Sequence, residues 1–183
     1  MALDSLRGRL LVAAPTLTDP NFSRTVVLVT EHTDDGAMGV VLNRPSEMEV
    51  DETVPELSEL AGDAAVIFHG GPVQPEALLV LAEFRDRSAA AAIVVADVGL
   101  VSADSETDEL VAATRRARVF AGYAGWGPGQ LEAEVEEGAW IVEPPVPGEL
   151  FATDHGGLWS AVLERKGGRF ALLARMPLDP SLN

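Results

Sequence analysis

The stretch from residue 25 to residue 42 reads TVVLVTEHTDDGAMGVVL and predicts the centre of a β-sheet. Its first six residues are β-branched or apolar on both faces, which is typical of a strand that is buried on both sides. The sequence Asp-Asp-Gly at residues 34–36 supplies a turn, and the apolar run at residues 38–42 returns as the second strand of a hairpin. The fold is therefore expected to grow outward from an antiparallel pair.

The hairpin also sets the distance between two polar residues. If the turn is centred near Asp35, Asn43 pairs close to Val27. His32 then pairs close to Met38. A rise of ~3.3 Å per residue separates His32 from Asn43 by about 16 Å. These two side chains are not expected to form one small site by themselves.

Further strands and short helices flank this hairpin. Strands are expected at residues 10–14, 65–68, 78–81, 118–123, 139–142 and 170–174, a tight loop at residues 125–127, and helices at residues 54–61, 105–116, 128–137 and 159–164. Residues 91–95 fit a strand or a helix, and their length and β-branching favour a strand. The helix at residues 105–116 has the clearest signal, because Ser105 can cap its first turn and two arginines suit the negative end of its dipole. Strands outnumber helices without strict alternation, which favours the α+β class with a mixed or largely antiparallel sheet.

Length and composition predict one folded domain over residues 1–183. Hydrophobic residues make up 47% of the 183 residues and the mean hydropathy is +0.14, so the chain can bury a core and is not generally disordered. There are 29 acidic and 13 basic residues, and the net charge of −16 keeps such a protein dispersed in water. The same charge disfavours binding to nucleic acid and to anionic membrane surfaces, because both depend on cations.

The chain contains no cysteine, which excludes disulfides, thiolate nucleophiles and cysteine metal sites. Residues 1–17 hold only a five-residue apolar run, which is too short for the core of a signal peptide. The longest apolar stretch, at residues 89–101, is interrupted by Asp97 and falls short of the ~20 residues that a membrane-spanning helix needs. We therefore expect a cytoplasmic protein that does not enter a membrane.

The glycine-rich motifs do not match cofactor-binding loops. The sequence Gly-Trp-Gly-Pro-Gly at residues 125–129 follows a predicted strand, but its third glycine comes one position too early for a dinucleotide fingerprint. Its proline also removes a main-chain donor. Lys166, the only lysine, has no P-loop before it. We therefore expect no cofactor.

Catalytic and metal-binding patterns are also missing from the sequence. His69-Gly70-Gly71 is similar to the oxyanion loop of esterases, but no Gly-x-Ser-x-Gly elbow accompanies it, and a glycine turn is the simpler interpretation. The three histidines lie far apart, and no pair has the spacing of helical metal ligands. The acidic run at residues 104–109 lacks the glycine of a calcium loop and fits the start of a helix. No catalytic residue and no metal ligand is assigned.

One group of binding candidates lies at the end of the predicted hairpin. Arg24, Asn43 and Arg44 bring two guanidinium groups and an amide to the same end. They can hold an anion, or they can simply solvate the ends of the strands. His69, in the glycine turn, is a further candidate.

A second group surrounds the glycine-rich loop at residues 125–129. Tyr123, Trp126 and Gln130 place polar-tipped aromatic rings and an amide there. Loops that carry such groups on a rigid scaffold are frequent binding sites. The alternative is that these rings belong to the core and that their tips are hydrogen-bonded inside the protein.

Several segments spread over nearly the whole chain form a specific pattern. They read GRLLVAAP at residues 8–15, DPNFSRTVV at 19–27, EH at 31–32, GAMGVVLNRP at 36–45, GGPV at 70–73, GYAGWGPGQLE at 122–132 and DPSLN at 179–183. Together they resemble the YqgE/AlgH family of small bacterial proteins. The chain departs from that pattern at Leu81 and Ala82, where relatives often carry a histidine, so a site that relies on this histidine is not expected here.

The resemblance implies an α+β fold with bent, partly bifurcated sheets in a single compact domain. It brings no established activity. Some members are labelled transcriptional regulators, of alginate synthesis in particular. This chain has no recognisable helix-turn-helix and has the wrong charge for direct contact with DNA.

The leading hypothesis is a non-catalytic domain that binds a small molecule or a protein partner and regulates indirectly. It rests on polar and aromatic loops that occur without a coherent nucleophile, metal or cofactor motif. The alternative is an unrecognised enzyme in which His69, Asn43 and Tyr123 act together, which requires one pocket that joins them. The identity of the ligand or partner and the oligomeric state stay open.

Direct DNA binding is a third hypothesis. It requires an unpaired basic face built from Arg115, Arg116 and Arg118, because affinity for DNA comes from cations that displace counterions. Pairing of these arginines with carboxylates would argue against it.

Overall fold

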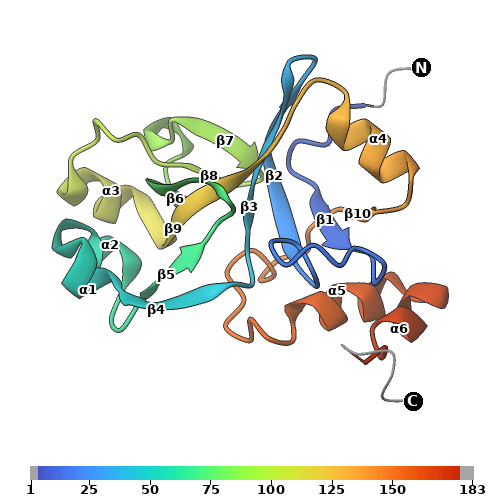
Figure 1. Ribbon diagram of the computed structural model, residues 1–183. Coiled ribbons are helices and arrows are strands. Elements are labelled where there is room, and N and C mark those ends of the chain that lie inside the picture. Colours follow the sequence, from blue (N-terminus) through green and yellow to red (C-terminus); the bar gives the residue numbers. More distant parts are fainter. Residues whose placement is uncertain (1–3, 178–183) are drawn as a thin grey trace.

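The hairpin predicted from residues 25–42 lies in the middle of a sheet of ten strands (Figure 1). The structure is a computed structural model that describes residues 4–177. The strands are β1 (Leu10–Ala13), β2 (Val26–Thr33), β3 (Gly36–Val41), β4 (Pro45–Glu49), β5 (Val66–His69), β6 (Val73–Phe84), β7 (Ala92–Val95), β8 (Val98–Leu100), β9 (Thr114–Trp126) and β10 (Trp140–Glu143). Their order is β10-β1-β2-β3-β9-β6-β8-β7, and β5 links β4 to β9 at the side of this path.

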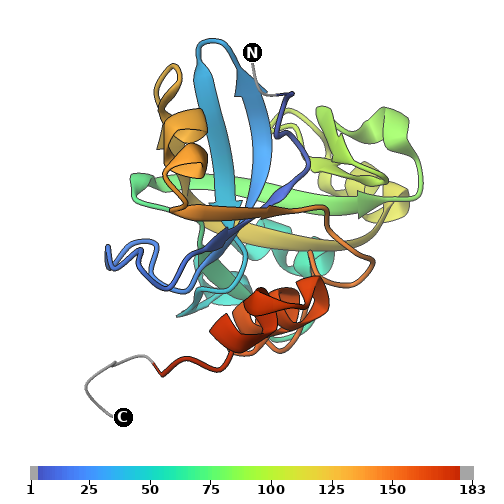
Figure 2. The same ribbon diagram turned by 90° about the vertical axis from the view of Figure 1, so that its right-hand side faces the viewer.

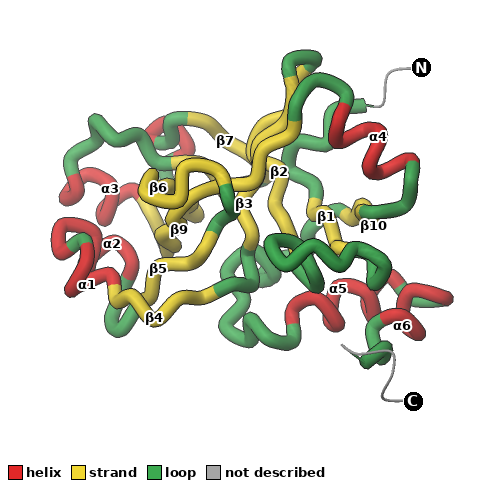
Figure 3. The backbone as a smooth tube through the Cα atoms, in the orientation of Figure 1, coloured by secondary structure: helices red, strands yellow, loops and turns green. Residues whose placement is uncertain are grey.

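Helices occupy the margins of the sheet (Figure 3). They are α1 (Val50–Thr53), the 3-10 turn η1 (Pro55–Leu57), α2 (Ser58–Ala61), the 3-10 turn η2 (Arg87–Ala89), α3 (Thr107–Ala113), α4 (Gln130–Glu136), α5 (Leu158–Lys166) and α6 (Arg169–Leu173). All are short, and none within residues 4–177 is long and apolar enough to cross a membrane. The α+β class and the single compact domain predicted from the sequence are confirmed.

The central hairpin forms as the sequence predicts, but its register differs: Val27 lies opposite Val41, two residues from the predicted partner Asn43. Residues 26–29 of β2 are completely buried, in agreement with a strand that is apolar on both faces. β2 and β3 pair antiparallel, but the register shifts between Val29 and Glu31. This irregularity places His32 opposite Ala37, one residue away from the predicted partner Met38.

The long strand β9 joins the two halves of the sheet. Its last residues, 124–126, pair with β3. Its earlier residues pair with β6 on one side and, in the parallel direction, with β5 on the other. The sheet therefore divides along β9, which is the bent, bifurcated arrangement that the family resemblance implies.

Three glycines allow the main chain to cross at this division. Gly122 has a φ of +74°, and a Cβ atom there would lie 2.4 Å from the carbonyl oxygen of Gly71. A Cβ on Gly70 would lie 2.2 Å from the carbonyl oxygen of Gly122, and one on Gly71 would lie 2.1 Å from the carbonyl carbon of Tyr123. No side chain fits between these segments, so the glycine turn at residues 69–71 is a close backbone crossing.

Three hydrophobic clusters fill the spaces between the sheet and the helices. The largest packs α5 and the following residues against one face of β1–β3. A second covers the opposite face of these strands and includes Trp126 and Trp140. The third lies beneath α1–α3 in the other half of the sheet. Figure 1 shows these two halves on either side of β3.

The helix predicted at residues 105–116 is shorter than expected. α3 starts at Thr107, and its N-cap residue is Glu106, which makes no side-chain cap, so Ser105 does not have the predicted capping role. Arg115 and Arg116 belong to β9, where Arg116 lies opposite Glu83 of β6. Pairing with β6 therefore outweighs the helical signal of the local sequence.

The prediction of a strand at residues 170–174 is wrong. This segment lies largely in α6, which folds back beside α5 after Gly167 and Gly168, both of which have positive φ. A five-residue apolar run has no period that would distinguish a strand from a helical turn.

The helix predicted at residues 128–137 starts two residues late, after Gly129 in the left-handed conformation, and Trp126 belongs to β9, not to a loop.

Two strands were not predicted. β4 carries the sequence PSEME, whose acidic and proline residues are unfavourable for strands, and β8 has only three residues. Both are formed by pairing with neighbouring strands, β4 with β5 and β8 with β6 and β7, rather than by their own residue pattern. The predicted short helix at residues 54–61 is divided into η1 and α2, with α1 before them.

Candidate functional site

The predicted group at the end of the hairpin is used partly to hold the backbone. The side-chain oxygen of Asn43 accepts a hydrogen bond from the main-chain N–H of Val26 at 3.0 Å, and its amide nitrogen donates to the carbonyl of Arg24 at 2.9 Å. The guanidinium of Arg24 lies 4.5 Å from the ring centre of Trp159 and donates to the carbonyl of Met176. Asn43 and Arg24 therefore anchor the hairpin end and turn away from any common pocket with His69.

The predicted group around the glycine-rich loop meets at one carboxylate. Glu134 accepts hydrogen bonds from the indole N–H of Trp126 at 2.8 Å, from that of Trp140 at 2.9 Å and from the amide of Gln130 at 3.1 Å. Phe22 packs against both indole rings, with centroids at 6.4 and 5.6 Å. The polar tips of Trp126 and Gln130 are therefore both hydrogen-bonded to Glu134, the first buried and the second at the surface.

A second carboxylate of α4 binds the hairpin to that helix. Nε2 of His32 lies 2.7 Å from an oxygen of Glu132, and Nδ1 of His32 accepts a hydrogen bond from the main-chain N–H of Leu6. Because Nδ1 accepts, Nε2 carries the proton and donates it to Glu132. The hydrogen bond from the main-chain N–H of Glu132 itself, followed by the one from His32, lowers the pKa of the Glu132 carboxyl.

Tyr123 lies at the crossing of the glycine segments. Its backbone is opposite Val73 in the pairing of β9 with β6, and the main chain of Gly71 passes directly against it. Its half-buried ring packs against the largest hydrophobic cluster. The position is set by the sheet and not by any contact with His69 or Asn43.

Arg44 and His69 do share a pocket. It has a volume of about 210 Å³ and is lined by Asn21, Val41, Arg44, His69, Gly71 and Pro72. The main-chain N–H of His69 donates to the carbonyl of Arg44 at 2.8 Å, at the pairing of β5 with the start of β4. Three segments that are far apart in the sequence, near residues 21, 44 and 70, therefore meet here.

The guanidinium of Arg44 is held rigidly at one side of this pocket. It donates to the carbonyls of Pro20 at 3.1 Å and of Ser23 at 2.8 Å. A guanidinium has five N–H donors, so three are left for other partners. Arg44 makes no ion pair with any residue from 4 to 177, and no carboxylate lines the pocket.

His69 and Asn21 add further polar groups to the pocket. Both are exposed, and neither side chain forms a hydrogen bond within residues 4–177. Arg44 and His69 were predicted from the sequence and Asn21 was not, although the segment at residues 19–27 is part of the family pattern. The pocket is rich in donors and can hold a small molecule with acceptor atoms.

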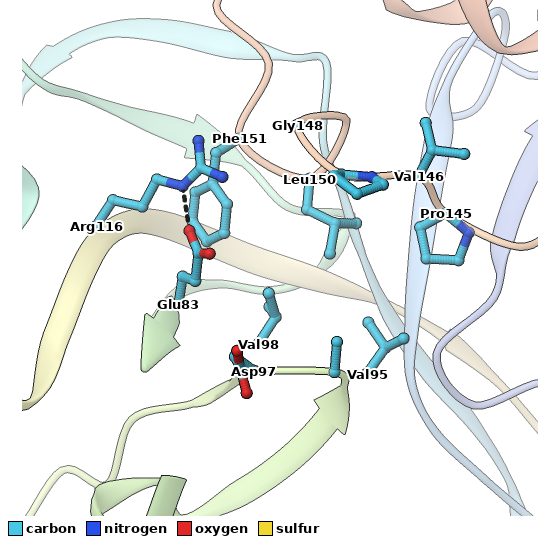
Figure 4. A pocket seen from close by; sticks show the side chains of 12 residues that line it. Glu83, Val95, Asp97, Val98, Arg116, Pro145, Val146, Gly148, Leu150 and Phe151 are labelled. Carbon is cyan, nitrogen blue, oxygen red and sulfur yellow. Dashed lines mark hydrogen bonds and ion pairs between the residues drawn. The ribbon is translucent and has the colours of Figure 1, made fainter. Parts of the chain in front are cut away.

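A second cleft lies beneath the proline-rich loop that follows β10 (Figure 4). It has a volume of about 300 Å³, and most of its walls are apolar, from Val95, Val98, Leu150 and Phe151. Arg116 donates through Nε to Glu83 at 2.6 Å at one end. Sequence analysis assigned none of these residues to a ligand site, and the prolines at residues 144–147 were its only local signal.

The three arginines considered for DNA contact do not form an unpaired basic face. Arg116 pairs with Glu83, and Arg115 lies 3.8 Å from Asp97. Arg118 lies over the ring of Phe68 at 4.4 Å, and burial, with a smaller effect of Arg116, lowers the pKa of its guanidinium to about 10.

Arg118 is close to the third histidine. The ring of His155 lies 4.8 Å from that of Phe68, and burial, followed by the charge of Arg118, lowers the pKa of its imidazole. Within residues 4–177, no group of three or more histidines and carboxylates has the arrangement of a metal site.

Comparison with known proteins places the chain in a family. The family model described as AlgH-like matches residues 10–171. The chain belongs to the AlgH-like family. An AlgH-like relative from Thermobifida fusca, a UPF0301 protein, is 48% identical over 98% of this chain and 96% of its own. A UPF0301 protein from Streptomyces coelicolor is 43% identical over 99% of this chain and 97% of its own.

Two solved structures have the same fold as this chain. A crystal structure of a protein from Corynebacterium diphtheriae matches with a TM-score of 0.87 and 26% identity, over 96% of this chain and 94% of that one. The solution structure of the AlgH protein from Pseudomonas aeruginosa matches with a TM-score of 0.71 and 31% identity, over 97% of each chain. The family resemblance seen in the sequence is therefore confirmed, and the names of these relatives state no molecular function.

Proposed function

We propose that this AlgH-like protein is a non-catalytic binding protein whose ligand is a small anion held by Arg44 and His69. The observation that carries the proposal is the donor-rich lining of their pocket. Arg44 keeps three N–H donors that no described residue accepts, and no carboxylate competes for them. A carboxylate or phosphate group accepts from a guanidinium in two parallel hydrogen bonds.

The charge of the whole chain makes this lining unusual. With 29 acidic residues against 13 basic ones, an exposed arginine has many possible carboxylate partners. Arg44 is instead directed onto two main-chain carbonyls, which fix its geometry without neutralising its charge. A cation that is held in place and not neutralised loses little conformational entropy when it binds an anion.

The size of the pocket limits the ligand. A volume of about 210 Å³ is below that of typical drug-sized sites and suits a small carboxylic acid or a phosphate group. The enzyme alternative needs a pocket shared by His69, Asn43 and Tyr123, and of these three only His69 lines this one. The arrangement therefore favours binding, and an effect on regulation would follow from what the bound state presents to a partner.

Thermal unfolding against a panel of small anions tests the proposal. Acetate, citrate, phosphate and nucleoside monophosphates are compared at constant ionic strength with chloride. A ligand at a hundred times its Kd stabilises the folded state by about 2.7 kcal/mol, which raises the Tm of a chain of this size by roughly 5–10 °C. We expect such a shift from at least one member of the panel.

Variants then locate the binding. Arg44→Gln and His69→Ala should abolish most of the shift, whereas Arg85→Gln, which changes an exposed arginine outside the pocket, should keep it. His69→Ala is the safer variant, because its side chain makes no hydrogen bond that folding requires. The proposal is wrong if no anion shifts the Tm, or if the shift is equal in the wild type and in both pocket variants.

A further inference from the structure

β10 lies at one end of the strand order and has one neighbour only. Within residues 4–177 it pairs with β1 and with no other strand. In Figure 2, β10 crosses the front of the molecule, with α4 above it and α5 and α6 below it. Among the described residues, no strand lies beside the edge that faces away from β1.

The direction of the hydrogen bonds shows which backbone groups lie on that edge. The main-chain N–H of Ala14 donates to the carbonyl of Ala139, so Ala139 and every second residue after it face β1. Trp140 and Val142 lie between them, and their N–H and C=O groups face outward. None of these four groups has a main-chain partner within residues 4–177. They form the row of donors and acceptors that an added strand requires.

A groove follows this edge. It has a volume of about 490 Å³ and is bounded by Ile141 and Val142 of β10, by Val135 and Gly138 at the end of α4, and by Lys166, Arg169, Phe170 and Leu173 of the α5–α6 pair. The α5–α6 wall combines apolar side chains with two cations. Lys166 pairs with Glu143, whereas Arg169 makes no ion pair within residues 4–177 and rests near the ring of Phe170.

The charged residues that line the groove are both cations in a strongly negative protein. Lys166 and Arg169 line it and no carboxylate among the described residues does, while the chain as a whole carries a net charge of −16. Arg165 and Lys166 pair with Glu143 and Glu149, so Arg169 carries the unpaired charge of this wall. Such a wall attracts acidic partners and repels basic ones over a Debye length of about 10 Å.

We propose that the free edge of β10 binds an extended peptide segment of a partner protein, added as a further strand and carrying acidic side chains toward the α5–α6 wall. Main-chain hydrogen bonds to Trp140 and Val142 supply affinity. Residues on one face of the added strand meet Phe170, Leu173 and Arg169, so an alternation of acidic and apolar residues supplies specificity. This inference does not depend on the anion pocket, which lies on other strands.

A second copy of the chain is a less suitable occupant. Two-fold pairing of β10 with itself would bring two α5–α6 walls together on the same face of the joined sheet. Arg169 and Lys166 of one copy would then approach those of the other, and like charges in that position oppose association. An acidic segment meets the opposite sign.

Selection from a library of displayed random dodecapeptides on the full-length protein tests the proposal. We expect enriched peptides to alternate acidic with apolar residues and to bind with an affinity that falls as salt rises. Val142→Pro removes one outward N–H without removing a hydrogen bond to β1 and should weaken an enriched peptide at least tenfold. Arg169→Glu should weaken it similarly.

The controls separate this edge from general charge effects. Arg175→Glu makes the same charge change in an exposed residue outside the groove and should leave the affinity within twofold. Arg169→Glu should also leave the free energy of unfolding within about 0.5 kcal/mol, because its side chain is exposed. The proposal is overturned if the enriched peptides lack acidic residues, or if they bind Val142→Pro and Arg169→Glu as they bind the wild type. It is also overturned if sedimentation shows a wild-type dimer that Val142→Pro abolishes.

Discussion

Trp140 belongs to two regions of this protein that differ in whether their hydrogen-bonding groups are paired. In one the side-chain donors have acceptors within the protein, and in the other the main-chain groups have no strand beside them. The indole N–H of Trp140 donates to Glu134, which also accepts from the indole N–H of Trp126 and from the side-chain amide of Gln130. The main-chain N–H and C=O of Trp140 lie on the outer edge of β10, where no strand pairs with them. The first region includes the glycine- and tryptophan-containing motif at residues 122–132, whereas β10 at residues 140–143 carries no motif that indicates binding.

The difference shows what identifies a binding surface in a fold of this kind. Trp126 and Gln130 were predicted to bind a ligand, but with Trp140 they donate to Glu134 and so hold α4, β9 and β10 together. The pocket of Arg44 and the edge of β10 are recognised by groups that remain unpaired after every internal hydrogen bond is assigned. Whether a donor or acceptor has a partner within the protein therefore distinguishes a structural polar group from one that is available to a ligand, and residue type does not.

The largest effect is expected at the glycine crossing of residues 70–71 and 122–123. Gly71→Ala should destabilise the fold by about 4 kcal/mol or more, or prevent folding, because its Cβ would lie 2.1 Å from the main chain of Tyr123 at a φ of +154°. Gly156→Ala is the matched control, since a Cβ there meets nothing within 4 Å. Urea unfolding of both variants checks the difference. If the two variants were equally stable, the crossing would not be the constraint described above.

A smaller effect is expected at the carboxylate shared by the two indoles. Glu134→Ala leaves the N–H groups of Trp126 and Trp140 without their acceptor, and these rings are 7% and 3% exposed. We expect a loss of about 2–4 kcal/mol in the free energy of unfolding. Glu136→Ala, an exposed change in the same helix, should cost less than about 0.5 kcal/mol. Equal values for the two variants would mean that the polar tips are not structural and would return Trp126 and Gln130 to the candidates for ligand binding.

The smallest effect concerns acid stability. Hydrogen bonds from its own main chain and from His32 lower the pKa of the Glu132 carboxyl below its ordinary value of 4.5. A carboxyl with a lowered pKa in the folded state stabilises the fold above its unfolded pKa, and this stability is lost as the pH falls through the folded pKa. Glu132→Gln should therefore show a shallower loss of stability below about pH 4.5 than the wild type. Urea midpoints measured from neutral pH downward test this, with Glu137→Gln expected to follow the wild-type curve.

Much of the fold was predictable because its central signals are local. The run at residues 25–42 predicts the hairpin from residue type and turn chemistry alone, and residues 10–14 and 139–142 are short apolar strands between clear breakers. The strand predicted at residues 170–174 was wrong because a run of five apolar residues has no period that distinguishes a strand from a helix. The helix predicted to continue through residues 114–116 was wrong because pairing with β6 decides the conformation of these residues. Pairing between distant segments is not contained in any local window.

The candidate site residues also differ in whether local sequence or long-range pairing determines their position. Arg24, Asn43 and Arg44 were correctly placed together, since the hairpin alone brings them to one end. That His69 joins Arg44 depends on β5 pairing with both β4 and β9, which only the folded sheet shows. The edge of β10 had no signal in its residues, because an unpaired backbone is a property of topology and not of side chains.

The central position of β9 has a consequence for the order in which the chain can fold during synthesis. β3, β5 and β6 are all made before β9 and all pair with it, so they leave the ribosome without their common partner. Until residue 126 has emerged, these strands present open edges to the surrounding cell, and pairings so far apart along the chain form slowly. The high negative charge that keeps the finished protein dispersed also protects the nascent chain over this interval, through repulsion between unfinished copies.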